Sequence, residues 1–334
     1  MSSPSPAPSA GRKADHLRIA AGDGVLHAGG SGLDGVRLRH RALPGRDLED
    51  VDLRVELLGA QLQAPLVVSA MTGGTAEAEA LNRRLALAAA EHGIALVLGS
   101  GRALLADPDL LRTYRSAARP PLLLANLGIA QLEDPGQAAR LVELLGADGL
   151  SIHLNPIQEA VQPEGQPCFG GAIERIAAAV DALAPLPVVV KEVGFGMDGA
   201  DIRALRDASV AAIDVAGAGG TNWALIEGQR DPAAGEVAAA FADWGVSTRE
   251  ALRAARAVAP ELPAIASGGL RDGVDAARCL ALGATAAGLA RPLLLAAAED
   301  RAGAAVAALV RQLQIATWAA GAASAAELGE EHLR

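Results

Sequence analysis

Cysteine is scarce in this chain of 334 residues, which contains only Cys168 and Cys279. Two cysteines so far apart in the sequence cannot build the disulfide framework of a small secreted domain, and they lack the close spacing of a zinc knuckle. No partner base is evident for Cys168, so we do not expect it to act as a nucleophile. The cysteine content fits the reducing cytoplasm, and we predict a cytoplasmic location.

Long apolar runs and leader segments are also absent. No stretch reaches the roughly 18 uninterrupted apolar residues that a membrane-spanning helix requires. The Ala-rich helix that we expect from Arg291 onward is interrupted by charges at Glu299 and Asp300. The first ten residues contain Ser, Pro and Ala without an apolar core, which argues against a signal peptide. We therefore expect no membrane partner, and a disordered tail over residues 1–11.

Positive charge is in deficit as well. The formal net charge is −10 at pH 7, which argues against nucleic acid or an anionic membrane surface as the main partner. No Ser-, Pro- or Gly-rich linker divides the chain after residue 11. Residues 12–334 are therefore predicted to form a single domain, with an N-terminal segment and a C-terminal helix added to it.

Eight short apolar runs, most of which end at a cluster of polar residues or glycine, are the main positive feature. Ala/Leu/Arg-rich stretches that are long enough for a helix separate most of these runs. The alternation predicts an α/β fold, and eight strand–helix units predict a closed TIM (β/α)8 barrel whose loops after the strands carry the active site. The runs are residues 65–70, 94–99, 121–125, 149–153, 187–191, 211–215, 263–267 and 285–290.

A phosphate site is predicted after the last two strands. Gly268 and Gly269 follow one strand and precede Arg271, and Ala290 and Arg291 follow the next strand at the start of a helix. Glycines let a phosphate approach the backbone, and the free N–H groups and dipole of a helix start favour an anion. In eight-fold barrels such a pocket often lies in the loops after strands seven and eight.

Other strand ends on the same face favour a flat ligand. The glycine-rich residues 214–221 and 70–74 would let the backbone lie against such a ligand. Asn126 and Thr221 belong to the same face. Lys191 ends a strand, where it is either a solvated lysine or a cation beside a cofactor ring that accumulates negative charge. Together with the phosphate pocket, these segments predict a phosphorylated aromatic cofactor.

The fourth strand ends in an unusually polar segment that contains His153, Asn155, Gln158 and Glu159. Gln158 and Glu159 are adjacent, so an amide and a carboxylate can serve different ligands from one loop. Glu159 is either a solvated loop carboxylate or a ligand of Mg²⁺, which takes one or two carboxylates together with substrate phosphate oxygens. His153 alone would more often be a structural histidine than a catalyst.

Basic residues cluster in two places in this acidic chain. Arg12, Lys13 and His16 lie near the N-terminus, and Arg102 directly follows the second strand. In a helix, Arg12 and His16 would lie one turn apart on the same face. The cluster is either an ordinary solvated segment or a clamp for a doubly charged group such as a diphosphate, with Arg102 as its second arm.

In their combination and order, these segments resemble the type 2 isopentenyl diphosphate isomerases, which are flavin enzymes of isoprenoid biosynthesis. The resemblance covers essentially the whole chain from Arg12 to Trp318, although each motif is weak by itself. The motifs are Arg12-Lys13 with His16, Met71-Thr72-Gly73-Gly74, His153-Leu154-Asn155 with Gln158-Glu159, Gly219-Gly220-Thr221 with Trp223, and Ser267-Gly268-Gly269.

The resemblance implies a barrel that holds FMN and converts isopentenyl diphosphate to dimethylallyl diphosphate with Mg²⁺ and reduced flavin. The reduced flavin itself would move a proton between the ends of the allylic unit, and NADPH would only reduce the flavin because the net reaction is redox neutral. The family commonly forms tetramers or octamers, so a homo-oligomer is expected.

The resemblance also implies a role for individual residues. The catalytic residues would be His153, Asn155, Gln158 and Lys191, of which the first three would line the substrate. The diphosphate would be held by Arg12, Lys13, His16, Ser100 and Arg102, with Gln158 also on the substrate and Glu159 on Mg²⁺. FMN would contact Ser69, Ala70, Met71, Thr72, Ser100, Asn126, Lys191 and Thr221, and its phosphate would lie among Gly268, Gly269, Arg271, Ala290 and Arg291.

Two departures from the family pattern leave other functions open. Gly101 stands where a larger polar side chain, often Gln, is usual, and the loss of one hydrogen bond would weaken substrate binding several-fold. Residues 166–169 carry less charge than expected. One alternative is a flavin oxidoreductase, either a 2-hydroxy acid oxidase, which would want a histidine base in residues 217–221, or a nucleotide dehydrogenase, which would want a cysteine there. A flavin-binding protein without turnover is the other alternative, and only an assay separates it from the isomerase.

Overall fold

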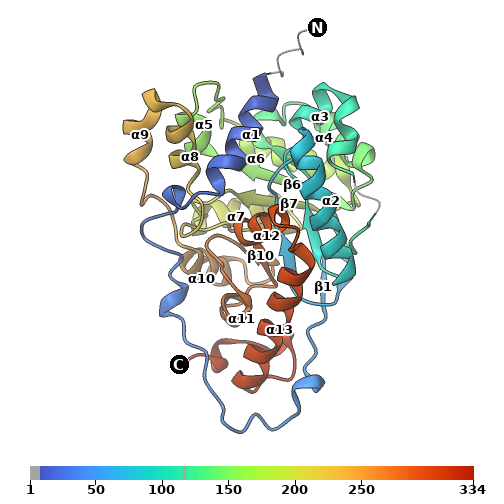
Figure 1. Ribbon diagram of the computed structural model, residues 1–334, viewed down its shortest axis with the longest axis vertical. Helices are drawn as coiled ribbons and strands as arrows, with labels where there is room; N and C mark the ends of the chain where they lie inside the picture. The colour runs from blue at the N-terminus through green and yellow to red at the C-terminus, as the bar shows by residue number, and fades with distance from the viewer. Residues whose placement is uncertain (1–7, 116–117) are drawn as a thin grey trace.

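The computed structural model describes residues 8–115 and 118–334, which form a closed barrel of eight parallel strands surrounded by helices (Figure 1). All eight apolar runs form the predicted strands, so the TIM barrel is confirmed. The strands follow one another around the barrel in the order β10-β3-β4-β5-β6-β7-β8-β9. They are β3 (Leu66–Val68), β4 (Ala95–Val97), β5 (Leu123–Gly128), β6 (Gly149–Leu154), β7 (Val188–Glu192), β8 (Ala212–Asp214), β9 (Ala264–Ala266) and β10 (Ala286–Leu289).

Helices follow most strands, and their ends are set by local sequence signals. For example, α4 begins at an Asp134 cap followed by Pro135 and ends at Gly146, which adopts the left-handed conformation with a φ of 60°. The helices after the barrel strands are α2 (Ala76–Glu91), α3 (Arg102–Ala106), α4 (Pro135–Leu145), α5 (Pro156–Val161), α6 (Ala172–Leu183), α7 (Gly199–Asp207), α8 (Trp223–Arg230), α9 (Gly235–Ala239), α10 (Thr248–Val258), α11 (Gly273–Ala281), α12 (Arg291–Ala298) and α13 (Ala302–Ala320).

A short antiparallel hairpin plugs the barrel at the amino ends of its strands. It consists of β1 (Val55–Leu57) and β2 (Ala60–Leu62), and the sequence analysis did not predict it. Leu57 and Leu62 are buried in one cluster with Val67, Leu124 and Val189 of the barrel interior. Because this end is filled with apolar side chains, the open end of the barrel lies at the carboxyl ends of its strands.

The N-terminal segment crosses the open end and then runs down the outside of the barrel (Figure 1). It begins with α1 (Pro8–Ala20), so residues 8–11, which we assigned to the disordered tail, are helical. Residues 1–7 of that tail lie outside the described residues. Lower down, Leu38 pairs with Leu333, and Trp318 Nε1 donates to the Arg46 carbonyl at 2.7 Å. The segment therefore joins the open end to the C-terminal region.

The C-terminal helix is divided, contrary to the prediction of one helix from Arg291 onward. It forms α12 and α13, and Asp300 in the turn between them has a φ of 58°, which a continuous helix does not allow. None of the helices in residues 8–115 and 118–334 combines the length and apolar character that crossing a bilayer requires. The 3-10 helices are η1 (Asp23–Val25), η2 (Leu33–Gly35), η3 (Leu48–Asp50), η4 (Pro108–Thr113), η5 (Ile129–Gln131), η6 (Pro232–Ala234), η7 (Ala325–Glu327) and η8 (Glu330–His332).

Candidate active site

A cavity of about 740 Å³ lies at the open end of the barrel, between the loops that follow the strands and helix α1. Every site residue predicted from the sequence lines this cavity, as the geometry of a barrel requires when the residues follow its strands. They are Arg12, Lys13, His16, Ser69, Ala70, Met71, Thr72, Ser100, Arg102, Asn126, His153, Asn155, Gln158, Glu159, Lys191, Thr221, Gly268, Gly269, Arg271, Ala290 and Arg291.

Two layers of glycine backbone form one wall of the cavity. Gly268 and Gly269 have φ values of 103° and 76°, which side chains rarely tolerate. A Cβ on Gly268 would lie 2.0 Å from the Gly217 carbonyl oxygen, and one on Gly269 would lie 2.5 Å from that of Gly219. Glycine is therefore required at both positions by close backbone packing as well as by conformation.

The start of α12 forms the floor of the predicted phosphate pocket. Its N-cap, Ala290, provides no side chain to bond the first N–H groups of the helix. Such groups, with the dipole of the helix, favour an anion. The Arg291 guanidinium is bound to the N-terminal segment. It donates to the Ala20 and Ala21 carbonyls at 3.1 and 2.9 Å and pairs with Asp23 at 2.6 Å.

Arg271 also lines the cavity with its guanidinium bound to protein. It pairs with Asp275 at 2.8 Å and with Asp34 at 2.6 Å, and its side chain is half-exposed. In this structure both guanidinium groups are thus bound to protein groups, although both residues line the cavity, whereas the resemblance places both residues around the phosphate. The backbone of Gly268, Gly269 and Ala290 lines the part of the cavity where we expect the phosphate.

Lys191 and His153 lie together inside the cavity. Lys191 is buried, donates to the Glu192 carbonyl at 2.7 Å, and lies 3.5 Å from the Asp214 carboxylate. His153 Nδ1 lies 2.7 Å from Asn126 Oδ1. Burial, with the positive charges of Lys191 and Lys13, lowers the pKa of His153 to about 4. The imidazole is therefore neutral at pH 7, and the amine is the cation of this wall.

Two buried polar atoms beside this pair lack a hydrogen-bond partner within the described residues. They are Ser69 Oγ and Asn126 Nδ2, and both residues line the cavity. Buried polar groups are nearly always satisfied in native proteins, so these two atoms fit a polar ligand in the cavity. Together with the glycine wall and the helix start, the donor set fits a flat, phosphorylated cofactor.

Glu227 organises the opposite wall, and the sequence analysis missed it. This fully buried carboxylate on α8 accepts from Gln158 Nε2 at 2.8 Å and from Arg230 Nε at 2.7 Å, and it lies 2.9 Å from His16 Nε2. Asn155 Nδ2 in turn donates to Gln158 Oε1 at 3.0 Å. The only signal in the sequence is its place one helical turn after Trp223, since burial of a glutamate cannot be read from the residue itself.

Glu227 makes the stability of the protein depend on pH. Burial alone would raise the pKa of Glu227, but the bonds and charge of His16, with bonds from Gln158 and Arg230, lower it from 4.5 to about 2. A carboxyl group with a lowered pKa stabilises the fold above its unfolded value, and this contribution is lost as the pH falls through the folded value. The shift corresponds to about 3 kcal/mol at pH 7.

We therefore expect Glu227→Gln to lower the free energy of unfolding more at pH 7 than at pH 3. Near pH 3 roughly half of the contribution from the ionised carboxylate is lost, so the free energies of unfolding of the parent and the variant become more similar. Urea unfolding of the parent and the variant at both pH values measures the difference. An equal loss at pH 7 and pH 3 would contradict the lowered pKa.

The four basic residues lie at the α1 side of the cavity. Lys13 Nζ donates to the Ser100 carbonyl at 3.2 Å and to the hydroxyl of Tyr114 at 2.9 Å. Arg12 lies 3.7 Å from Glu164. The Arg102 guanidinium makes no hydrogen bond or ion pair with residues 8–115 or 118–334, although its side chain is half-buried. Both lysines of the chain, Lys13 and Lys191, thus line one cavity of an acidic protein.

Glu159 is the sole carboxylate of the predicted metal site. Its oxygens accept from Asn155 Nδ2 at 3.1 Å, from Gln162 Nε2 at 2.8 Å and from the Gln166 N–H at 2.7 Å. Within the described ranges, no group of three or more His, Cys, Asp or Glu side chains could hold a metal ion. One carboxylate fits Mg²⁺ only where a ligand supplies further oxygens, as a diphosphate does.

Gly101, the departure from the family pattern, has a structural counterpart. A Cβ at this position would lie 2.5 Å from Leu141 Cδ1, which belongs to α4 and is fully buried. The space that a side chain at residue 101 would occupy is therefore filled by Leu141.

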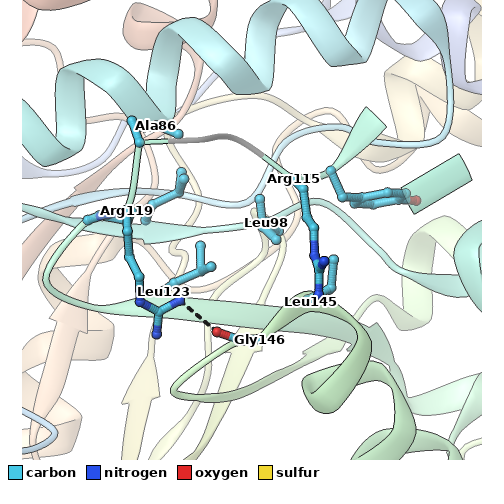
Figure 2. Close-up of a pocket in the computed structure, with 11 residues that line it drawn as sticks. Ala86, Leu98, Arg115, Arg119, Leu123, Leu145 and Gly146 are labelled. Carbon is cyan, nitrogen blue, oxygen red and sulfur yellow. Dashed lines mark hydrogen bonds between the residues drawn. The ribbon is translucent and has the colours of Figure 1, made fainter. Parts of the chain in front are cut away.

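A second cavity of about 320 Å³ lies outside the barrel, between α2 and the end of α4 (Figure 2). Arg119 donates to the Gly146 carbonyl at 2.6 Å, as the dashed line shows, and Arg115 is a further lining residue. This cavity contains none of the predicted site residues.

Comparison with known proteins agrees with this geometry. The family described as FMN-dependent dehydrogenase matches residues 11–104 and 170–334. In three dimensions the chain is similar to a variant of mandelate oxidase with a monooxide FMN adduct (TM-score 0.66, 20% identity, 96% of this chain and 91% of that chain). It is also similar to a flavocytochrome b2 variant with benzoylformate (TM-score 0.71, 19% identity, 96% of this chain and 82% of that chain). At such identities these likenesses show the fold alone.

Sequence relatives are much closer. The isopentenyl-diphosphate delta-isomerase of Xanthobacter autotrophicus is 48% identical over 93% of this chain and 94% of its own length. The protein of the same name from Synechococcus sp. is 46% identical over 86% of this chain and 85% of its own length. The chain therefore belongs to the isopentenyl-diphosphate delta-isomerase family, built on the barrel of the FMN-dependent dehydrogenases.

Proposed function

We propose that the protein interconverts isopentenyl diphosphate and dimethylallyl diphosphate with FMN as its cofactor. The observation that carries the proposal is the division of one cavity into two parts. One part has a glycine wall and an open helix start, which suit a flat phosphorylated ring, and the other gathers Arg12, Lys13, His16 and Arg102, which suit a diphosphate.

The cofactor part of the cavity suits FMN. Ser69 Oγ and Asn126 Nδ2 offer free polar atoms to the ring, and Lys191 offers a positive charge. When bound and reduced, FMN supplies the acid–base group that moves a proton across the allylic unit. The proposed ring contacts are Ser69, Ala70, Met71, Thr72, Ser100, Asn126, Lys191 and Thr221, and the proposed phosphate contacts are Gly268, Gly269, Arg271, Ala290 and Arg291.

The chain's own residues hold the substrate in one orientation. The cations and Ser100 would bind the diphosphate, and Glu159 would hold Mg²⁺, which would supply positive charge to the diphosphate. Gln158 is fixed by Asn155 and Glu227, so its amide would meet a bound substrate in one orientation. Neutral His153 can donate or accept one hydrogen bond without adding a charge.

NADPH is proposed as the reductant of the flavin, because the isomerisation itself consumes no electrons. A homo-oligomer of four or eight chains is proposed as well, and light scattering measures it. The exposed apolar side chains of Val237 and Trp244, which are 56% and 59% accessible, support association between chains.

An oxidase that acts on 2-hydroxy acids has less support. Such an enzyme needs a histidine base at the end of the sixth barrel strand, and a nucleotide dehydrogenase needs a cysteine there. Residues 217–221, which follow β8, contain neither. The likeness to mandelate oxidase and flavocytochrome b2 concerns the fold alone and gives no support to an oxidase.

The decisive experiment follows isopentenyl diphosphate by proton NMR. The purified protein is loaded with FMN, reduced anaerobically with dithionite or NADPH, and given the substrate with and without Mg²⁺. We expect dimethylallyl diphosphate to form only with reduced flavin. A protein that binds and reduces FMN but leaves the substrate unchanged would contradict the proposal, and reduction of the flavin by a 2-hydroxy acid would favour the oxidase.

Glu159→Gln tests the metal site. The substitution keeps the size of the side chain but removes the charge that attracts Mg²⁺, so we expect a higher Mg²⁺ concentration for half-maximal activity, by about tenfold, with FMN still bound. Metal titrations of the parent and the variant measure it. Glu143→Gln, the same change at an exposed position on α4, is the control. Identical metal titration curves for the Glu159 variant and the parent would remove Glu159 from the metal site.

A further inference from the structure

Tyr114 is the only tyrosine of the chain, and it stands directly behind the proposed diphosphate site. Its side chain is 1% exposed, and it follows η4. The hydroxyl accepts a hydrogen bond from Lys13 Nζ at 2.9 Å and donates one to the Ser100 carbonyl at 2.8 Å. Lys13 Nζ also donates to the same Ser100 carbonyl at 3.2 Å. The three polar groups therefore form a closed triangle.

Within this triangle, one N–H group of the Lys13 ammonium has no bond to Tyr114 or Ser100. An ammonium group has three N–H donors, and the described residues take up two of them, at Tyr114 and Ser100. The third N–H is left for an anion in the cavity that Lys13 lines. Because a flexible lysine side chain otherwise samples many rotamers, two fixed acceptors reduce the entropy that is lost when the anion binds.

The tyrosine ring is itself held by the loops that carry the site. A Cβ on Gly73 would lie 2.0 Å from Tyr114 Cε1, so the ring packs directly on the backbone of the loop after β3. The neighbouring Thr113 accepts the Gly74 N–H at 2.9 Å, and Asn82 Nδ2 donates to the carbonyls of Thr72 and Thr113. These contacts tie residues 113–114 to the loop that is proposed to contact the flavin.

Tyr114 also lines the second cavity of about 320 Å³. The two hydrogen bonds of its hydroxyl, to Lys13 and to the Ser100 carbonyl, define where the oxygen lies. A phenylalanine would keep the packing on Gly73 and lose only these two bonds.

We propose that Tyr114 is a positioning residue for the diphosphate of the substrate, which acts by orienting the ammonium group of Lys13. The proposal rests on the proposed function in that the anion is taken to be the substrate's diphosphate. It adds a residue to which neither the motif pattern nor the comparisons gave a role. Removal of the hydroxyl leaves Lys13 with a single protein acceptor, the Ser100 carbonyl.

The charge state of Lys13 provides an independent readout. Burial, followed by the charge of Arg12, lowers the pKa of Lys13 to about 8. Tyr114, whose pKa is raised by burial, is bonded to it. The other charged or titratable side chains that line the same cavity are Arg12, His16, Arg102, His153, Glu159, Glu164, Lys191, Arg271 and Arg291. A hydroxyl that accepts from an ammonium group favours the charged form, so its loss lowers the pKa further.

The test compares Tyr114→Phe with the parent, both loaded with FMN. We expect KM for isopentenyl diphosphate to rise about fivefold to tenfold with kcat changed by less than about twofold, since one hydrogen bond to a charged group is lost. FMN affinity and the melting temperature should stay close to those of the parent. Thr317→Val, which removes a buried hydroxyl bonded within α13 far from the cavity, is the control.

A double-mutant cycle decides whether the effect passes through Lys13. In a Lys13→Met background, which lacks the ammonium group, Tyr114→Phe is expected to change KM by less than about twofold. An equal effect in both backgrounds would overturn the proposal, because Tyr114 would then act on the site independently of Lys13. Lys13 is half-buried on α1, so Lys13→Met does not replace a residue of the hydrophobic core.

Two further measurements separate this proposal from the proposed function. Calorimetric titration with inorganic pyrophosphate needs no turnover, and we expect Tyr114→Phe to weaken its binding by about the same factor as KM. Because Lys13 and Lys191 are the only lysines, carbon-13 labelling of lysine Cε gives one NMR signal for each, and the Lys13 signal should titrate at lower pH in the variant. Unchanged pyrophosphate affinity and an unchanged titration would overturn the role of Tyr114. A protein without isomerase activity that shows both changes would overturn only the proposed function.

Discussion

Replacement of Glu227 by glutamine is expected to lower kcat for isopentenyl diphosphate by about 100-fold, the cost of misplacing a reacting group by about an ångström. The carboxylate accepts from Gln158 and Arg230 and lies 2.9 Å from His16 Nε2. A glutamine offers one acceptor oxygen and one NH₂ group, so at least one of these neighbours would face a donor. The amide of Gln158 would then turn away from its bond to Asn155.

Steady-state kinetics of the reduced, FMN-loaded variant measure this loss. Glu236→Gln, the same chemical change on an exposed side chain of α9, is the matched control and is expected to behave as the parent. Flavin fluorescence checks that FMN is still bound, since Glu227 is not among the residues that line the cavity. A Glu227 variant with the kcat of the parent would show that Gln158 needs no support from α8.

The barrel could be predicted because its physical cause is visible in the sequence. Each buried parallel strand is a short apolar run, and the polar or glycine-rich residues after it mark the open end. The hairpin of β1 and β2 was missed because its two-residue turn, Leu58-Gly59, carries only half of the usual signal, the glycine at the second position. Gly59 adopts a φ of 81°, as such turns require, but Leu58, with a φ of 54°, stands where Asn or Asp is usual.

The site was predicted in position but only partly in its contacts. The topology alone brings the strand ends together, which is why the predicted residues share one cavity. The partners of Arg271 and Arg291 could not be foreseen, because Asp34 and Asp23 come from a segment more than 200 residues earlier that packs against the barrel only in three dimensions. Glu227 was missed for a related reason, since the side chains around it come from α1, from α5 and from its own helix.

Arg102→Ala is expected to raise KM for isopentenyl diphosphate by about 100-fold while kcat and FMN affinity change little. Among the described residues the guanidinium has no protein partner, although its side chain is half-buried at the start of α3 and lines the cavity. A guanidinium without a protein partner that faces the diphosphate contributes mainly to substrate binding. Its removal costs the bidentate contact that a guanidinium makes with phosphate oxygens.

Arg102→Lys separates charge from geometry. Lysine keeps the positive charge but not the planar fork of donors, so we expect a rise in KM of about tenfold, between those of the parent and the alanine variant. Arg140→Ala, which removes an exposed arginine from α4, controls for the change in net charge. Kinetics in which both Arg102 variants keep the KM of the parent would exclude Arg102 from diphosphate binding and leave Arg12, Lys13 and His16 as the whole clamp. If instead the lysine variant matches the alanine variant, the paired geometry of the guanidinium, more than its charge, is what the substrate requires.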